Sequence, residues 1–163
     1  MPYSPFGRIL AVDPGKWYVG VALFNQKTLV DADIVEYPHA RTDRNEADAA
    51  AYLGRACAKY SPVHSCVVEN QIIRRQRTQR GRQADIVPLA RTNGAILACV
   101  EANERVMVHY ATWASGRSAR ALPVHVRSRL TVDETAILQG KRLYNNEHVI
   151  DAVGIGLWAT ARM

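Results

Sequence analysis

The sequence predicts an α/β fold in which a mixed five-stranded sheet is flanked by helices. Three strand-like segments follow one another near the N-terminus, and helical and strand-like segments alternate after them. Of the 163 residues, 48% are hydrophobic, which is ample for a continuous core. No internal repeat or linker is visible. We therefore expect residues 1–163 to form a single domain.

The first three strands are expected to form an antiparallel meander. Residues 8–13 are an apolar run, and residues 17–24, after a Pro14-Gly15 turn, are rich in aromatic and β-branched residues. Residues 28–37 follow a short polar break. Such runs separated by short turns are typical of hairpin-connected strands.

Helices and strands alternate in the rest of the chain. An alanine-rich amphipathic stretch predicts a helix over 43–60, and an apolar run predicts a strand over 63–69. A second helix is expected over 85–104, a fifth strand over 105–111 and a last helix over 146–163. This order is that of a ribonuclease H-like sheet, with parallel strands added to the meander.

Carboxylates end two of these strands, Asp13 the first and Glu69 the fourth. In a ribonuclease H-like order these two strands are neighbours, so both side chains would lie at one edge of the sheet. Carboxylates brought together raise each other's pKa unless a cation lies between them, and hard divalent ions prefer oxygen ligands. Taken singly, Asp13 is equally an ordinary turn residue before Pro-Gly, and Glu69 a surface residue.

The last helix adds a third carboxylate. His148 and Asp151 are three residues apart and share a helix face, whereas Glu147 points about 100° away. After Asp151 the side chains through Trp158 are apolar or small. Carboxylates from three elements with a histidine would suffice to hold two Mg²⁺ or Mn²⁺ ions, roughly 3.5–4 Å apart, for phosphodiester hydrolysis. The simpler alternatives are a helix-start aspartate favoured by the dipole and a polar histidine without a metal role.

Five segments, in order, resemble the RuvC-type Holliday-junction resolvases of the ribonuclease H-like superfamily. Each is short and common alone, but together they span nearly the whole chain. They are Ile9-Leu10-Ala11-Val12-Asp13-Pro14-Gly15 with Gly20, Val68-Glu69-Asn70-Gln71, Leu89-Ala90-Arg91-Thr92-Asn93-Gly94-Ala95-Ile96-Leu97, Tyr110-Ala111, and His148-Val149-Ile150-Asp151-Ala152.

The resemblance implies a Mg²⁺-dependent endonuclease of recombination and repair, with Mn²⁺ as a substitute. It would act as a homodimer and resolve four-way (Holliday) DNA junctions by paired symmetrical nicks. Carried over by position, Asp13, Glu69 and Asp151 would be ligands of two ions. His148 would fill a fourth place, held in the family by aspartate or histidine, either as a ligand or in proton transfer.

Two departures from the family pattern stand out. The wedge position after the catalytic glutamate is held by Ile72 and Ile73, so the wedge would be aliphatic. The Gly-Ser-rich, lysine-containing segment before the last helix is replaced by residues 117–134. The chain therefore resembles a divergent member of phage or mobile-element type.

The charge balance favours a polyanionic partner. Lys and Arg number 21 against 15 Asp and Glu, a net charge of +6. Most of the cations are arginines, which favours forked contacts to phosphate oxygens over a merely solvated charged face. The candidate DNA-contacting residues are Arg74, Arg75, Arg77, Arg80 and Arg82, with Ile72 and Ile73, and then Arg117 and Arg120 in the basic stretch 115–129, which is expected to be a loop or poorly ordered arm.

The apolar face of the 85–104 helix has two readings. Ile86, Leu89, Ile96 and Val100 suit either the core or, as the resemblance implies, a dimer interface. The three cysteines show neither disulfide nor zinc spacing and are expected to be buried thiols. No stretch approaches the ~20 apolar residues of a membrane span, so we expect a location in bacterial cytoplasm, at the nucleoid, or in a phage-infected cell.

Three other functions compete with junction resolution. A ribonuclease H-like nuclease acting on RNA–DNA hybrid or on branched or flap DNA would use the same site. A non-catalytic junction-binding module would use the arginines alone and leave the converging carboxylates unexplained. An ATPase of the actin or sugar-kinase class needs a second nucleotide-binding half, for which 163 residues leave no room.

Overall fold

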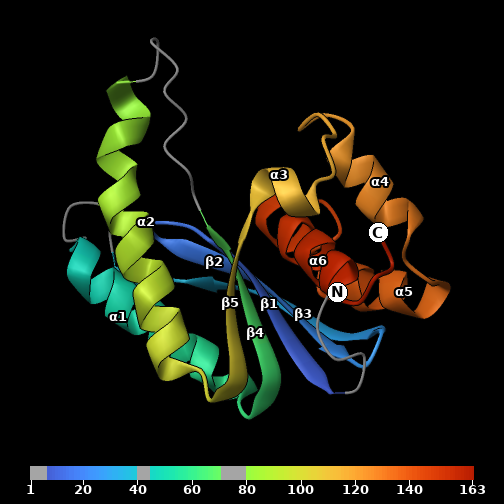
Figure 1. The fold of residues 1–163 in the computed structure, drawn as a ribbon, viewed down its shortest axis with the longest axis horizontal. Coiled ribbons are helices and arrows are strands. Elements are labelled where there is room, and N and C mark those ends of the chain that lie inside the picture. The colour runs from blue at the N-terminus through green and yellow to red at the C-terminus, as the bar shows by residue number, and fades with distance from the viewer. Residues whose placement is uncertain (1–6, 40–44, 71–79) are drawn as a thin grey trace.

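The computed structural model describes residues 7–39, 45–70 and 80–163, with residues 80–85 described by their backbone alone. Within these ranges a five-stranded sheet lies between two groups of helices (Figure 1). The strands are β1 (Arg8–Pro14), β2 (Tyr18–Asn25), β3 (Thr28–Glu36), β4 (Val63–Asn70) and β5 (Ala102–His109).

The strand order in the sheet is β3-β2-β1-β4-β5. The pairs β3–β2 and β2–β1 are antiparallel, and β1–β4 and β4–β5 are parallel. The predicted architecture is therefore confirmed, including the adjacency of the first and fourth strands on which the predicted site depends.

Helices cover both faces of the sheet (Figure 1). On one face lie α1 (Glu46–Cys57), a 3-10 helix (Ala58–Tyr60) and α2 (Arg80–Cys99); on the other lie α3 (Tyr110–Trp113), α4 (Leu122–Ser128), α5 (Val132–Gly140) and α6 (Glu147–Ala159). Among the described residues no helix combines the length and apolarity needed to cross a bilayer.

Each face of the sheet has its own apolar core. Along β1, Leu10 and Val12 belong to the core shared with α1 and α2, whereas Ile9 and Ala11 belong to the core shared with α6. Because strand side chains alternate between faces, Asp13 follows Ile9 and Ala11 and points toward α6. The pleat of β1 thus decides which helix can complete the site.

The second helix was predicted at the wrong boundaries. It was expected over 85–104 but runs from Arg80 to Cys99, and β5 correspondingly begins at Ala102 and ends before Tyr110. The Arg105 guanidinium from β5 donates hydrogen bonds to the carbonyls of Leu97, Val100 and Ala102, just where the helix ends. These contacts satisfy orphan carbonyls from outside the helix, so its own periodicity could not reveal its end.

The prediction of a loop or poorly ordered arm over 115–129 was also wrong. This stretch contains α4, which has a proline in its first turn and buries Leu122 and Val126, four residues apart, against the core beside α6. The next helix, α5, was not predicted. It begins with a capping box formed by Thr131 and Glu134.

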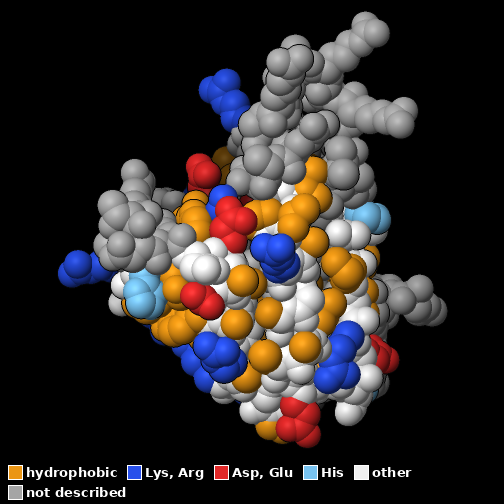
Figure 2. Space-filling model, turned by 90° about the vertical axis from the view of Figure 1, so that its left-hand side faces the viewer, with side chains coloured by type: hydrophobic (Ala, Val, Ile, Leu, Met, Phe, Trp, Pro, Cys, Tyr) orange, Lys and Arg blue, Asp and Glu red, His pale blue; other side chains and the backbone are white. Residues whose placement is uncertain are grey.

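Two of the four proposed interface residues are not available to a partner. Ile96 and Val100 are completely buried in the core between α2 and the sheet, so assigning them to a dimer interface was wrong. Ile86 and Leu89 are half-buried, and Val87 beside them is 58% exposed. Figure 2 shows the α1–α2 side of the molecule, where hydrophobic side chains lie among scattered basic ones.

Candidate active site

The parallel pairing of β1 and β4 brings two predicted carboxylates to the same edge of the sheet. Val12 pairs with Val68, so Asp13 and Glu69 follow at the next position of each strand and on the same face. Both are buried, with 5% and 6% of their surface exposed. A turn aspartate or a surface glutamate would be exposed, so neither simpler reading fits.

Helix α6 brings His148 to this edge. Its Nδ1 lies 2.6 Å from Oδ2 of Asp13. The approach depends on Gly20, which is paired with Asp13 in the sheet, because a Cβ at residue 20 would lie 2.1 Å from the His148 carbonyl oxygen. Asn146 caps the helix by accepting a hydrogen bond from the backbone N–H of Val149. The predicted meeting of Asp13 and His148 is present in the structure.

Two buried residues that were given no role from sequence hold Glu69 in place. The indole N–H of Trp113 donates to Oε2 of Glu69 at 3.0 Å. The side-chain amide of Asn93 donates to the Glu69 backbone carbonyl at 3.1 Å. Asn93 belongs to a segment of the family resemblance, but only the fold shows what it contacts. For Trp113 the sequence signal is weak. A buried indole N–H needs a hydrogen-bond acceptor, but the sequence does not show which residue supplies it.

The carboxyl groups of the site share an excess of negative charge. Burial, reinforced by Asp13 and Asp151, raises the pKa of Glu69 to about 8 despite the Trp113 hydrogen bond. Burial and Asp13 raise the pKa of Asp151 to about 7, with His148 opposing. Burial also raises the pKa of Asp13 against the opposing effect of His148. Asp151 is thus coupled electrostatically to both strand carboxylates.

His148 is the cationic partner of this group. Its hydrogen bond with Asp13 raises the pKa of the imidazole, with Asp151 and Glu147 adding to the rise. The Tyr18 ring packs against it, with 4.5 Å between the ring centroids. Among the described residues, His148 alone offers positive charge to these three carboxyl groups, and a cation would relieve their mutual repulsion.

The residue types fit a divalent cation. Carboxylate oxygens are the preferred ligands of Mg²⁺ and Mn²⁺. Within the described ranges, however, no three His, Cys, Asp or Glu side chains gather closely enough to hold an ion as they now lie. The donor set therefore fits a divalent cation by its chemistry and charge.

The proposed DNA-contacting residues are placed in part. Arg120 is exposed, and Arg117 is half-buried with a guanidinium N–H directed to the Ala114 carbonyl at 3.4 Å. Arg80 and Arg82 lie in α2, where only their backbone is described. The remaining candidates, Ile72, Ile73, Arg74, Arg75 and Arg77, lie outside the described residues.

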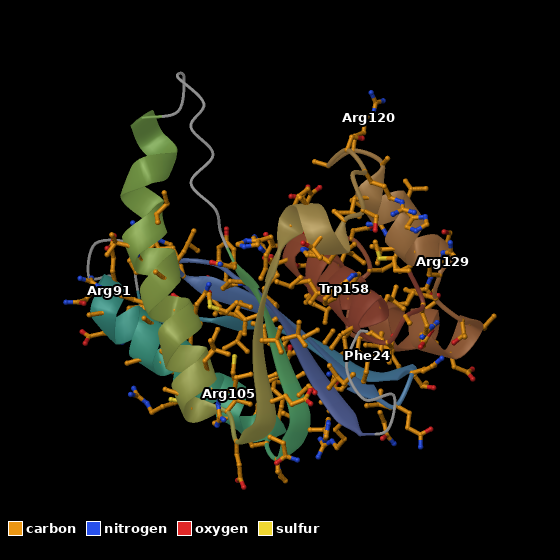
Figure 3. The ribbon with its side chains drawn as sticks, in the orientation of Figure 1. Phe24, Arg91, Arg105, Arg120, Arg129 and Trp158 are labelled. Atoms are coloured by element: carbon orange, nitrogen blue, oxygen red, sulfur yellow. The ribbon has the colours of Figure 1, made fainter. Side chains whose placement is uncertain are left out.

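Two further arginines are exposed: Arg91, which was not singled out from the sequence, and Arg129, which belongs to the basic stretch 115–129. Arg91 lies on α2, and Arg129 directly follows α4. Figure 3 shows Arg91 on the α2 side of the molecule and Arg120 and Arg129 on the side of α3 and α4. Exposed arginine is therefore present on both sides of the sheet.

Solved structures are similar to this chain although sequences are not. No family model and no curated protein sequence matches it. Thermus thermophilus RuvC in complex with Holliday junction substrate aligns at 16% identity and a TM-score of 0.64, covering 93% of this chain and 91% of that one. The yeast mitochondrial Holliday junction resolvase Ydc2 aligns at 12% identity and a TM-score of 0.66, covering 99% and 83%. The resemblance seen in the sequence thus extends to the structure, and the chain has the ribonuclease H-like fold of RuvC and Ydc2.

Proposed function

We propose that this chain is a metal-dependent endonuclease that resolves four-way DNA junctions by paired symmetrical nicks, as a homodimer. One observation carries the proposal: carboxyl groups from β1, β4 and α6 gather at one sheet edge beside His148. The strand carboxyls are buried and Asp151 is half-buried; Asp13 and Asp151 help to raise the pKa of Glu69, and Asp13 helps to raise that of Asp151. Buried carboxylates without matching charge destabilise a fold, so their gathering calls for a functional reason.

The same residues would hold the metal. Asp13, Glu69 and Asp151, with His148 as a fourth, would bind two Mg²⁺ ions, for which Mn²⁺ would substitute. When bound, such ions supply an activated water and stabilise the departing oxygen of a phosphodiester. Because ligands must be ionised to bind, and the pKa values of Glu69 and Asp151 are raised, ion binding would release protons and strengthen as the pH rises.

His148 has two possible roles, which differ in what happens to its bond with Asp13. As a ligand, the imidazole must be neutral and turn a ring nitrogen toward the ion. As a proton-transfer group, it keeps its Nδ1 on Asp13 at 2.6 Å and exchanges a proton at Nε2 with the reacting water. His148→Gln separates the two, because loss of metal binding supports the first role and loss of cleavage with intact metal binding supports the second.

The arginines would bind the arms of the junction. Arg91, Arg120 and Arg129 are exposed and lie on the two sides of the sheet (Figure 3). Such contacts to phosphates position a substrate without reading its sequence. We expect binding to weaken steeply with added salt, in proportion to the number of phosphates contacted.

The test compares four substrates with the wild-type protein and Asp13→Asn, each in Mg²⁺ and in EDTA. The substrates are a four-way junction, a flap, an RNA–DNA hybrid and linear duplex DNA. We expect symmetrical paired nicks in the junction, lost in EDTA and reduced by more than about 100-fold in the variant, beyond the usual effect of removing an outer-shell partner. Asp133→Asn, at an exposed position of α5, is the matched control and should cleave normally.

The other outcomes separate the competing functions. Cleavage of the hybrid or the flap in preference to the junction would support a ribonuclease H-like nuclease of another specificity. Tight junction binding without cleavage under any metal condition would support a binding module. Cleavage that Asp13→Asn leaves intact would overturn the assignment of this site.

A further inference from the structure

We propose that Trp113 is a positioning residue that holds the Glu69 carboxylate in the orientation needed to bind the metal. The inference rests on the proposed function. It also explains why a fully buried tryptophan follows β5 at this point. The bond that carries it is the 3.0 Å contact from the indole Nε1–H to Oε2 of Glu69.

The indole ring is fixed by its surroundings. Trp113 has no exposed surface, and it packs against α6 where Gly154 leaves room for it: a Cβ at residue 154 would lie 2.6 Å from the ring. The ring of Tyr110 contacts it edge-on, with 5.3 Å between centroids. A donor held on several sides fixes the direction of its hydrogen bond, so the indole is suited to orient a neighbour.

The chemistry of the contact indicates that the indole N–H orients the Glu69 carboxylate, and does not merely find a hydrogen-bond acceptor there. The indole offers one donor and no acceptor, and it binds one of the two carboxylate oxygens of Glu69. This limits rotation of the carboxylate. Asn93 holds the backbone of the same residue from α2, through the Glu69 carbonyl. Glu69 therefore accepts a hydrogen bond at its side chain from α3 and one at its main chain from α2.

A backbone carbonyl would have satisfied a buried indole equally well. The acceptor is instead an ionisable side chain of the site, where a hydrogen bond to a charged oxygen is strong and directional. Outer-shell donors of this kind orient metal ligands, and their loss typically costs about 10–100-fold in metal affinity or activity. We expect the same range for Trp113.

The decisive comparison is between Trp113→Phe and Trp158→Phe. Both remove an indole from the α6 side of the sheet, but Trp158 is a partly buried residue of α6 that packs against that core (Figure 3). We expect Trp113→Phe to weaken Mn²⁺ binding, measured by calorimetry, by about 10–100-fold. Trp158→Phe should lower the melting temperature to a similar extent without changing Mn²⁺ affinity.

A second readout is independent of activity and leaves Trp113 itself unchanged. The chain has three tryptophans, so Trp17→Phe/Trp158→Phe leaves Trp113 as the sole tryptophan fluorophore. Because its N–H contacts Glu69, Mn²⁺ or Mg²⁺ binding should shift its emission, and adding Glu69→Gln should abolish that shift. If the folded protein binds the ion and the Trp113 emission does not change, the inference is overturned.

The outcomes also separate this inference from the proposed function. Wild-type cleavage with the same Mn²⁺ affinity and turnover in Trp113→Phe would overturn the role of Trp113 and leave the nuclease standing. A wild-type protein that neither binds a divalent ion nor cleaves any substrate would overturn the proposed function, and the role of Trp113 with it.

Discussion

Glu69 and Glu134 are both buried glutamates beside α6, one near each end of that helix, and their surroundings differ in one respect. Burial acts to raise the pKa of each. At Glu134, hydrogen bonds from Arg162, Thr131 and Leu29 overcome it and lower the pKa to about 2. At Glu69, Asp13 and Asp151 add to the effect of burial and outweigh the Trp113 hydrogen bond, so the pKa rises to about 8.

The difference separates a structural carboxylate from a candidate functional one. Both oxygens of Glu134 accept from Arg162, and the Arg162 guanidinium also donates to the carbonyls of Lys27 and Arg129, so this clamp ties α5 and the C-terminal end to β3. The site has no comparable guanidinium among the described residues. The Arg162 guanidinium keeps Glu134 ionised although it is buried, whereas a bound cation would relieve the repulsion among the carboxyl groups of the site.

The largest stability effect is expected from breaking the clamp. Arg162→Met would leave Glu134 buried and unpaired, which typically destabilises a protein by about 3–5 kcal/mol. The free energy of unfolding from urea denaturation measures it. Arg120→Met, at an exposed position, is the control and should change little. A loss under about 1 kcal/mol, the range of surface pairs, would contradict the comparison.

Glu134 and Glu69 should affect the pH dependence of stability in opposite directions. Glu134 holds fewer protons folded than unfolded, so its contribution is present above pH 4.5 and disappears as the pH falls toward about 2. Glu69 holds more protons folded, so stability is greatest below pH 4.5 and declines as the pH rises through about 8. Without divalent ions we expect maximal stability near pH 4–5, roughly where both contributions are retained.

Glu69→Gln should remove the decline on the alkaline side. At pH 8 we expect this variant to be more stable than the wild type by roughly 1–3 kcal/mol, since it cannot ionise. Mg²⁺ should raise the melting temperature of the wild type at that pH and leave the variant unchanged. Melting curves from pH 3 to 9 test both statements, and a variant that is less stable than the wild type at pH 8 would contradict them.

The parts of the site that lie in one segment, or follow from strand order, were predictable. Asp13 and Glu69 end apolar runs, and His148 and Asp151 share a helix face, so the order of elements was enough to bring them together. The clamp was not predictable, because Glu134 and Arg162 are 28 residues apart and meet only when α5 and the end of α6 pack against β3. Trp113 was missed for the same reason, since its acceptor lies 44 residues earlier in the chain.

The predicted boundaries of helices were wrong where contacts with other elements determine them. The end of α2 depends on Arg105 from the following strand, and α4 depends on a core that Leu122 and Val126 reach only in the folded chain. Local composition around α4, rich in arginine with glycine and proline, predicts a loop. Two apolar residues four apart in so short a segment were too weak a signal to outweigh it.

The two ends of α6 can be compared with the same substitution. A Cβ at Gly20 would lie 2.1 Å from the His148 carbonyl, and a Cβ at Gly156 would lie 2.0 Å from the Phe24 ring. Either alanine variant should be less stable by about 1–3 kcal/mol through overpacking. Only Gly20→Ala should also weaken Mn²⁺ binding, because it displaces the turn that carries His148. Equal losses of Mn²⁺ affinity in both variants, measured by calorimetry, would show that the site depends on the whole helix.

The smallest effect is expected from the caps. Asn146 caps α6 through the Val149 N–H, and Asn45 caps α1 through the N–H groups of Ala47 and Asp48. Alanine at either position should lower the free energy of unfolding by about 1 kcal/mol. Asn146→Ala should in addition loosen the first turn of α6 and the 2.6 Å contact between His148 and Asp13, which an NMR titration of the imidazole would detect as a fall in its pKa. The same fall in Asn45→Ala would mean that the contact follows global stability, whereas a change confined to Asn146→Ala would show that the order of one helical turn sets the charge of the site.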